Sequence, residues 1–115
     1  MEIFRLLREG KMKDDNFRNL LGKWKYNPPW DDSDDCRSEY EISGTAEHPI
    51  VKGKDFYDGE EFIISSVSWN GKILQFESVM ESTGRKGINR FTLEDDGLIS
   101  NEYTFTETDK LTRIS

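Results

Sequence analysis

Apolar and polar residues alternate with a period of two through most of the chain after Leu20, and turn-forming residues interrupt the alternation at regular intervals. This period is typical of β-strands with one buried face, whereas an amphipathic helix repeats about every 3.6 residues. Short strands separated by frequent turns indicate an antiparallel meander rather than strand–helix–strand units. The pattern predicts eight strands, at residues 20–27, 38–46, 49–57, 61–69, 72–80, 88–94, 98–106 and 110–115.

The residues before the first strand follow a different pattern. Residues 1–9 can form a short helix that ends at Gly10, with one apolar face made of Ile3, Phe4, Leu6 and Leu7. Asp15 is expected to cap a single helical turn within residues 16–21. We therefore divide the chain into an N-terminal helix and connection, residues 1–15, and a β-domain, residues 16–115.

Turn sequences predict which residues face each other in the hairpins. Asn70-Gly71 favours a two-residue loop that sets Trp69 opposite Lys72. This register predicts one apolar face holding Ile63, Val67, Trp69, Leu74 and Phe76. For Asp95-Asp96-Gly97 a three-residue loop separates apolar from charged residues, because it sets Leu93 opposite Ile99, whereas a shift by one residue would mix the faces.

The last predicted hairpin places an arginine on the inner face. It sets Phe105 opposite Leu111 and Tyr103 opposite Arg113. Closure of the sheet would bring Arg113 over the indole of Trp24, a cation–π contact of about 0.5–2 kcal/mol. The sequence thus predicts an all-β fold, an eight-stranded antiparallel up-and-down barrel with a short N-terminal helix, in which closure removes the open sheet edges.

The combination of Leu-x-Gly-x-Trp at residues 20–24 with an arginine on the last strand is similar to the calycins, the group of lipocalins and fatty-acid-binding proteins. The chain looks most like their small bacterial lipocalin-like domains. In this group the tryptophan lies at the closed end of the barrel and the arginine packs across it; the matching residues are Gly22, Trp24 and Arg113. The C-terminus also resembles the Thr-Arg-x-Tyr ending of fatty-acid-binding proteins, which holds a lipid carboxylate, but Ser115 stands in place of the tyrosine.

This resemblance implies a non-catalytic barrel that binds a small apolar or amphipathic ligand. Polar side chains among apolar ones on the inner face are typical of ligand pockets. The predicted ligand-binding residues are Trp24, Ser65, Phe76, Ser78, Asn89, Asn101, Tyr103 and Arg113. The alternative is a filled core whose polar groups bond to each other or to trapped water, in a protein-interaction or structural module.

A second apolar face is predicted on the outside of the sheet. It consists of Phe56, Phe62, Ile64, Ile73 and Val79. Exposed apolar patches usually bind a partner. The predicted partner is the N-terminal helix of the same chain or of a second copy, which would give a homodimer.

Composition narrows the classes of function. A formal net charge of -7 disfavours nucleic-acid binding. Cys36 is the single cysteine, which excludes an internal disulfide and favours a reducing compartment. No stretch is apolar for the length of a membrane span, and we expect a cytoplasmic protein.

No catalytic or metal-binding pattern is evident. Residues 30–36 carry carboxylates suited to a hard cation, but they lack the glycine and glutamate of an EF-hand loop. His48 is the only histidine, which does not suffice for a zinc site. The nitrobindins bind haem through a lone histidine, but His48 precedes Pro49 and is expected at a rim. We therefore predict no enzyme activity, no cofactor and no metal.

Overall fold

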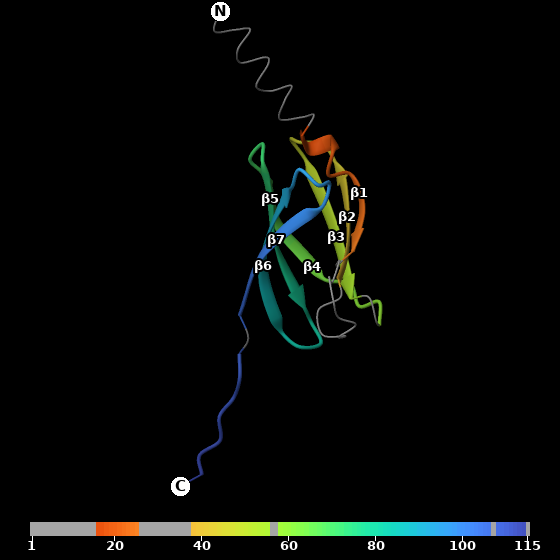
Figure 1. Ribbon diagram of the computed structural model, residues 1–115. Coiled ribbons are helices and arrows are strands. Elements are labelled where there is room, and N and C mark those ends of the chain that lie inside the picture. Colours follow the sequence, from red (N-terminus) through yellow and green to blue (C-terminus); the bar gives the residue numbers. More distant parts are fainter. Residues whose placement is uncertain (1–15, 26–37, 56–57, 107, 115) are drawn as a thin grey trace, which may run out of the picture.

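The computed structural model describes residues 16–25, 38–55, 58–106 and 108–114, and within them the fold is a β-meander in two facing sheets (Figure 1). The sheet nearer the N-terminus has the strand order β1-β2-β3, and the second sheet has the order β4-β5-β6-β7. All neighbouring strands are antiparallel. The strands are β1 (Gly22–Lys25), β2 (Ser38–Gly44), β3 (Pro49–Asp55), β4 (Ile63–Trp69), β5 (Ile73–Met80), β6 (Arg85–Leu93) and β7 (Ile99–Thr106).

The predicted eight-stranded barrel is wrong. Neither sheet closes on itself, because among the described strands β1 pairs only with β2, and β7 only with β6. Residues 108–114, where the last strand was predicted, form no strand and lead away from both sheets in Figure 1. Arg113 is therefore exposed and does not reach Trp24, whose indole N–H donates to the carbonyl of Leu20 at 2.8 Å.

The chain passes from one sheet to the other at a corner after β3. There the N–H of Phe62 donates to the carbonyl of Gly53 at 2.8 Å, and the N–H of Asp55 donates to the carbonyl of Glu60, also at 2.8 Å. These bonds continue the ladder for a few residues beyond β3, and Lys54 and Glu61 form an isolated bridge. The corner therefore fixes one side of the space between the sheets, while on the other side the described strands β1 and β7 do not pair with each other.

One end of this space is filled by a hydrophobic core. The predicted helical turn is confirmed at residues 16–18, and its side chain Phe17 packs edge-on against Trp69 with ring centroids 5.6 Å apart. Burial of one large apolar side chain contributes about 1.5–3 kcal/mol, so Phe17 holds the turn against the sheet that contains β4. The buried apolar residues are Phe17, Leu20, Ile42, Val51, Trp69, Leu74, Phe76 and Phe91.

The hairpin between β6 and β7 has the predicted register. Leu93 pairs with Ile99, and the N–H of Glu94 donates to the carbonyl of Leu98 at 2.8 Å, which leaves a three-residue loop. Gly97 has a φ of 84°, the left-handed conformation that glycine adopts without strain. The separation of apolar from charged faces was therefore a reliable guide to register in this hairpin.

The register predicted for the hairpin between β4 and β5 is wrong. Trp69 pairs with Leu74, because the side chain of Asn70 accepts the N–H groups of Lys72 and Ile73 at 2.9 and 2.7 Å and moves the turn by one residue. The register then shifts at a β-bulge between residues 65 and 68, where Ser66 has a φ of 53°. A bulge adds one residue to one strand and so reverses the faces beyond it.

Two predicted positions change with this bulge. Ile63, predicted to lie on the inner face, is 49% exposed, while Ile64 packs against the core. Ser65 lies outside and its hydroxyl is 3.5 Å from a carboxylate oxygen of Glu77, whereas its predicted neighbour Phe76 is fully buried.

Candidate functional site

The inner faces of the strands change from apolar to polar away from the hydrophobic core. Moving away from the core, the inward-facing residue after Phe76 on β5 is Ser78. On the antiparallel strand β6, the inward-facing residue after Phe91 in the same direction is Asn89. The same direction on β2 gives Ile42, Tyr40 and Ser38. Because these strands lie side by side or face each other, their polar positions gather at one end of the space between the sheets.

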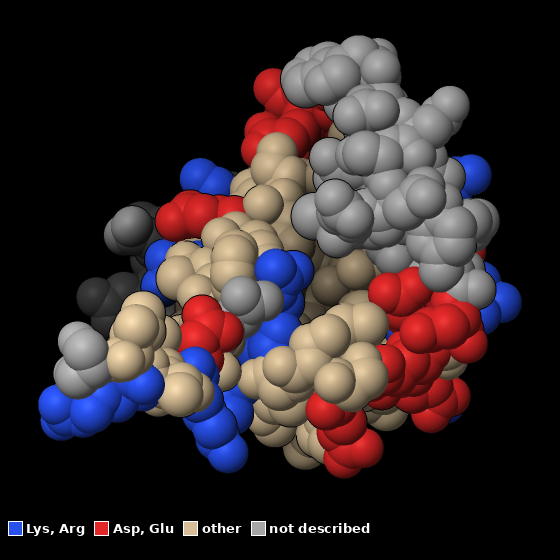
Figure 2. Space-filling model, turned by 90° about the horizontal axis from the view of Figure 1, so that it is seen from below, with Lys and Arg blue, Asp and Glu red and all other residues tan. Residues whose placement is uncertain are grey.

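A cavity of about 570 Å³ occupies this end and is lined on one side by residues of β1 and β7. Such a volume is within the range of small-molecule sites, about 300–1,000 Å³. Figure 2 shows the molecule from below, with a hollow in the surface and both basic and acidic side chains around it. The cavity is lined by Trp24, Lys25, Ser38, Tyr40, Asp55, Phe62, Ser78, Met80, Arg85, Asn89, Phe91, Glu94, Asp96, Leu98, Ile99, Ser100, Asn101 and Tyr103.

A row of hydrogen-bonded polar side chains crosses the wall of the cavity. The side-chain amide of Asn89 donates to the hydroxyl of Ser78 at 3.0 Å, and its oxygen accepts from the amide of Asn101 at 3.1 Å. Asn101 in turn accepts the backbone N–H of Arg90 at 3.2 Å. The row therefore has a fixed orientation, because each link is anchored to the next strand.

This row keeps unused hydrogen-bond donors. Asn89 is 0% exposed and Ser78 is 8% exposed, yet within the described ranges the Ser78 hydroxyl hydrogen and the second amide hydrogen of Asn89 have no protein acceptor. A buried polar group without a partner is costly, and native proteins usually satisfy it with water or a ligand. Both residues line the cavity, and Ser78, which is slightly exposed, is the donor that an acceptor in the cavity reaches first; the fully buried Asn89 orients the Ser78 hydroxyl from behind.

Tyr40 lies on the sheet that faces this row and is the centre of a group of aromatic rings at the base of the cavity, the aromatic floor. The ring of Tyr40 contacts Phe62, Phe76 and Phe91 with centroid distances of 6.1, 5.6 and 5.2 Å. Burial raises the pKa of the Tyr40 phenol to about 12; a hydrogen bond with Ser38 acts in the opposite direction, and the nearby Tyr103 adds to the increase. The phenol therefore stays protonated at alkaline pH values at which an exposed tyrosine ionises.

Two glycines make room for the tyrosine rings. A Cβ on Gly53 would lie 2.8 Å from ring carbons of Tyr40 and 3.0 Å from Phe62. A Cβ on Gly87 would likewise collide with the ring of Tyr103. The two glycines thus allow the rings to lie flat across the strands and shape the cavity walls.

Of the predicted site residues, five line the cavity and three do not. Phe76 lies beneath the aromatic floor in the core, Ser65 lies on the outside, and Arg113 lies on the exposed C-terminal segment. The predicted residues that line the cavity are Trp24, Ser78, Asn89, Asn101 and Tyr103.

Sequence reasoning missed the aromatic floor, including Tyr40, Phe62 and Phe91. The alternation along residues 38–44 placed Tyr40 on the same face as Ile42, which was a usable signal. Phe62 was assigned to the outer apolar face, but it contacts Tyr40 and would touch a side chain at Gly53. Ile64 also faces inward, so these two residues do not contribute to the predicted outer dimer surface; Phe56 lies outside the described residues.

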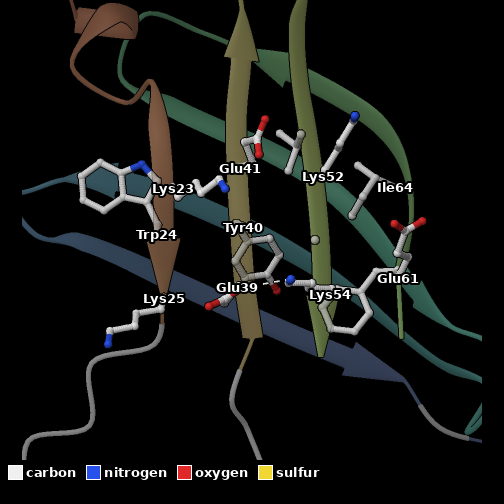
Figure 3. Close-up of a pocket in the computed structure, with 13 residues that line it drawn as sticks. Lys23, Trp24, Lys25, Glu39, Tyr40, Glu41, Lys52, Lys54, Glu61 and Ile64 are labelled. Atoms are coloured by element: carbon white, nitrogen blue, oxygen red, sulfur yellow. Dashed lines mark ion pairs between the residues drawn. The ribbon is translucent and has the colours of Figure 1, made fainter. Parts of the chain in front are cut away.

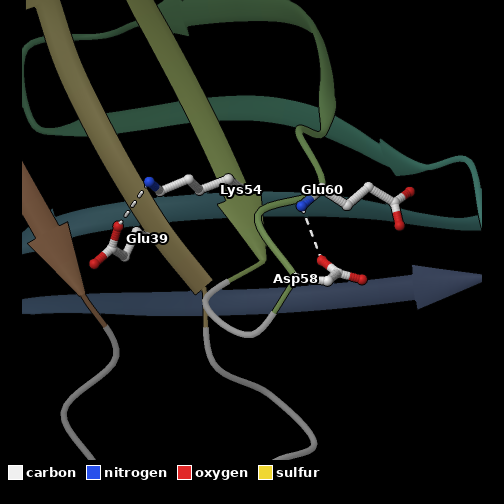
Figure 4. Close-up of polar contacts among 4 residues, drawn as sticks. All are labelled: Glu39, Lys54, Asp58 and Glu60. Carbon is white, nitrogen blue, oxygen red and sulfur yellow. Dashed lines mark hydrogen bonds and ion pairs between the residues drawn. The ribbon is translucent and has the colours of Figure 1, made fainter.

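A second hollow, of about 690 Å³, lies against the sheet of β1, β2 and β3 (Figure 3). Charged residues of alternating sign line it across the three strands: Lys23, Glu41 and Lys52 in one row, and Lys25, Glu39 and Lys54 in the next. Lys54 and Glu39 form an ion pair at 3.6 Å; Figure 4 shows this pair beside the turn in which Asp58 accepts the N–H of Glu60. Opposite charges on neighbouring strands stabilise a sheet, which accounts for these residues without a ligand.

The remaining sequence features concern His48, a membrane span, the acidic segment and the N-terminal helix. His48 is exposed in the turn between β2 and β3, where its N–H donates to Thr45, and within the described ranges no three His, Cys, Asp or Glu side chains could hold a metal ion. In the same residues no helix is long and apolar enough to cross a membrane. The acidic segment 30–36 and the N-terminal helix lie outside the described residues.

Comparison with known proteins gives no match: no family model, curated protein or solved structure matches this chain. The resemblance to the calycins therefore stays a prediction that rests on Gly22, Trp24 and Arg113.

Proposed function

We propose that the protein binds a small, neutral, amphipathic molecule in the cavity between its sheets, without catalysing a reaction. The observation that carries this proposal is the pair of buried donors on Ser78 and Asn89, which have no protein acceptor within the described residues and line a cavity with aromatic walls. Because both groups donate, the ligand needs an acceptor such as a carbonyl, ether or hydroxyl oxygen. Its apolar part would lie on Tyr40 and Phe62.

The chemistry of the cavity favours a ligand without charge. Its most buried polar groups are a hydroxyl and an amide, and the phenol of Tyr40 is neutral at physiological pH, as a tyrosine ordinarily is. The charged side chains that line the cavity have both signs: Lys25 and Arg85 against Asp55, Glu94 and Asp96. An ionic ligand next to Ser78 and Asn89 would lose its hydration without gaining a matched counter-charge, which costs several kcal/mol.

The proposal is tested with prodan, a neutral naphthalene with a carbonyl acceptor and a fluorescence that responds to polarity and hydrogen bonding. We expect saturable binding with a blue-shifted emission. Ser78→Ala should weaken binding about five-fold, the equivalent of one hydrogen bond of about 1 kcal/mol. Ser65→Ala is the matched control, since Ser65 lies on the outer side of the same sheet and should leave binding unchanged.

Two results would contradict the proposal. One is no saturable prodan binding together with no copurified small molecule in native mass spectrometry. The other is equal binding by the wild type, Ser78→Ala and Asn89→Leu, provided that thermal unfolding shows all three folded. Either result would mean that the two donors do not recognise a ligand in the cavity.

A further inference from the structure

We infer that two copies of this chain associate by exchanging residues 108–114, which add to the open edge of β7 in the other copy. This inference rests on the open edge and the C-terminal segment, and it stands whether or not the cavity binds a ligand. A sheet edge with unpaired backbone groups readily accepts a further strand, and domain swapping uses a segment that already belongs to the protein.

The acceptor surface is β7 itself. Among the described strands it pairs only with β6, and every residue from 100 to 106 is exposed. Its inward-facing aromatic residues, Tyr103 and Phe105, stack on each other at 5.7 Å and remain 40% and 47% exposed. Natural proteins protect long edges of this kind with charge, proline, bulges or a covering segment, and β7 contains no proline.

The donor is the segment that follows β7. Leu111 is 96% exposed and Ile114 is 100% exposed, and Figure 1 shows the segment in an extended course away from both sheets. Its described residues form no strand within their own chain. Such a segment cannot pair with its own β7 unless the chain turns back, but it is free to pair with the β7 edge of a second copy.

The side-chain pattern selects one register. Tyr103 and Phe105 share the inward face of β7, because their pairing partners on β6, Asn89 and Gly87, are buried on that face. Setting Leu111 of the second copy opposite Phe105 places Arg113 of the second copy opposite Tyr103. A shift by one residue would set Phe105 against Lys110 or Thr112 and lose the apolar contact.

This register is symmetric. If Phe105 of one copy faces Leu111 of the other, an antiparallel pairing makes Thr108 face its own counterpart on a two-fold axis. The interface is then isologous and closed, so it gives a dimer rather than an open chain of molecules. Each copy supplies both the exposed edge and the segment that covers it.

A single-cysteine experiment tests the symmetry. In the full chain with Cys36→Ser, Thr108→Cys should form a disulfide-linked dimer under mild oxidation. Thr104→Cys alone should not, because its expected partner is position 112, but a mixture of Thr104→Cys and Thr112→Cys chains should form linked heterodimers. A segment folded back on its own chain would instead link the double variant Thr104→Cys/Thr112→Cys internally, which would overturn the inference.

Sedimentation velocity supplies an independent readout. We expect the full chain to dimerise with rising concentration and Leu111→Thr to raise the dissociation constant at least ten-fold. Ile114→Thr is the matched control, since it removes similar apolar area from the outward face and should change the constant less than three-fold. Both residues are exposed in the single chain, so neither change should alter its folding. A wild-type protein that stays monomeric at millimolar concentration, or equal effects of the two variants, would overturn the inference.

Discussion

Tyr40 and Tyr103 use the same local device in different surroundings. Each ring lies across a strand at a glycine, Tyr40 at Gly53 and Tyr103 at Gly87. Tyr40 is enclosed by three aromatic rings, two of which belong to the opposite sheet. Tyr103 is 40% exposed on the edge strand β7, where it stacks on Phe105, which lies under the guanidinium of Arg85 at 4.2 Å.

In both places the glycine makes space for the ring, and we expect the rings packed above Tyr40 to make its contact the more stabilising of the two. A ring held between two layers cannot move without disturbing its neighbours, because protein interiors are close-packed. A ring on an edge strand has fewer close-packed neighbours. The two glycine positions should therefore respond differently to the same substitution.

The largest expected effect comes from adding a methyl group at each glycine. Gly53→Ala places a Cβ 2.8 Å from Tyr40 and 3.0 Å from Phe62, and should lower the free energy of unfolding by about 2–3 kcal/mol. Gly87→Ala should lower it by less than about 1 kcal/mol, since Tyr103 is 40% exposed on an edge strand and is not covered by a second layer of rings. Urea unfolding followed by tryptophan fluorescence measures both values.

Lys52→Ala is the control for these substitutions, because Lys52 is the exposed neighbour of Gly53 on β3. It should change the free energy of unfolding by no more than about 0.5 kcal/mol. Equal losses for Gly53→Ala and Gly87→Ala would mean that Tyr103 is as firmly enclosed as Tyr40.

Much of the fold was predictable because alternation and turn chemistry act locally. The seven strands of the meander were predicted with ends correct to within a few residues, and the Asp95-Asp96-Gly97 hairpin was predicted in full. The Asn70-Gly71 hairpin was misread because an Asn side chain can cap either of two neighbouring turns. The bulge at Ser66 has no sequence signal that alternation alone can detect.

Closure of the sheet was not predictable from the same evidence. The Leu111 and Arg113 pattern is that of a strand, but alternation does not specify which edge a strand joins or whether that edge belongs to its own chain. The polar part of the site was predictable because Ser78 and Asn89 interrupt apolar faces. Phe62 was not, because its direction depends on the corner between β3 and β4, where the ladder passes from one sheet to the other.

The second prediction uses pH to report on the enclosed tyrosine. The pKa of Tyr40 is raised from 10.0 to about 12, chiefly by burial. The unfolded chain therefore loses its proton first, and the stability associated with the neutral phenol is complete below pH 10 and is lost as the pH rises toward 12. The loss should reach about 2–3 kcal/mol, since the shift is about two units and one unit of pKa corresponds to about 1.4 kcal/mol.

Tyr40→Phe and Tyr103→Phe separate the two rings in this experiment. Denaturant unfolding between pH 9 and 12 should show the alkaline loss in the wild type and in Tyr103→Phe, and a shallower one in Tyr40→Phe. An unchanged pH profile in Tyr40→Phe would assign the loss to another group and contradict the enclosure of Tyr40.

The smallest expected effect extends the comparison to the outer faces of the two sheets. Glu39 lies between Lys25 and Lys54 on the sheet of β1 to β3, so Glu39→Lys sets three positive charges in a row and should cost about 0.5–1 kcal/mol. On the other sheet Arg90 lies between Gln75, its hydrogen-bond partner at 2.9 Å, and Glu102, so Arg90→Glu brings together only two like charges and should cost about half as much. In 1 M NaCl the Debye length falls to about 3 Å, and most of both losses should disappear. A loss at Glu39 that persists in high salt would show that this side chain contributes through packing rather than charge.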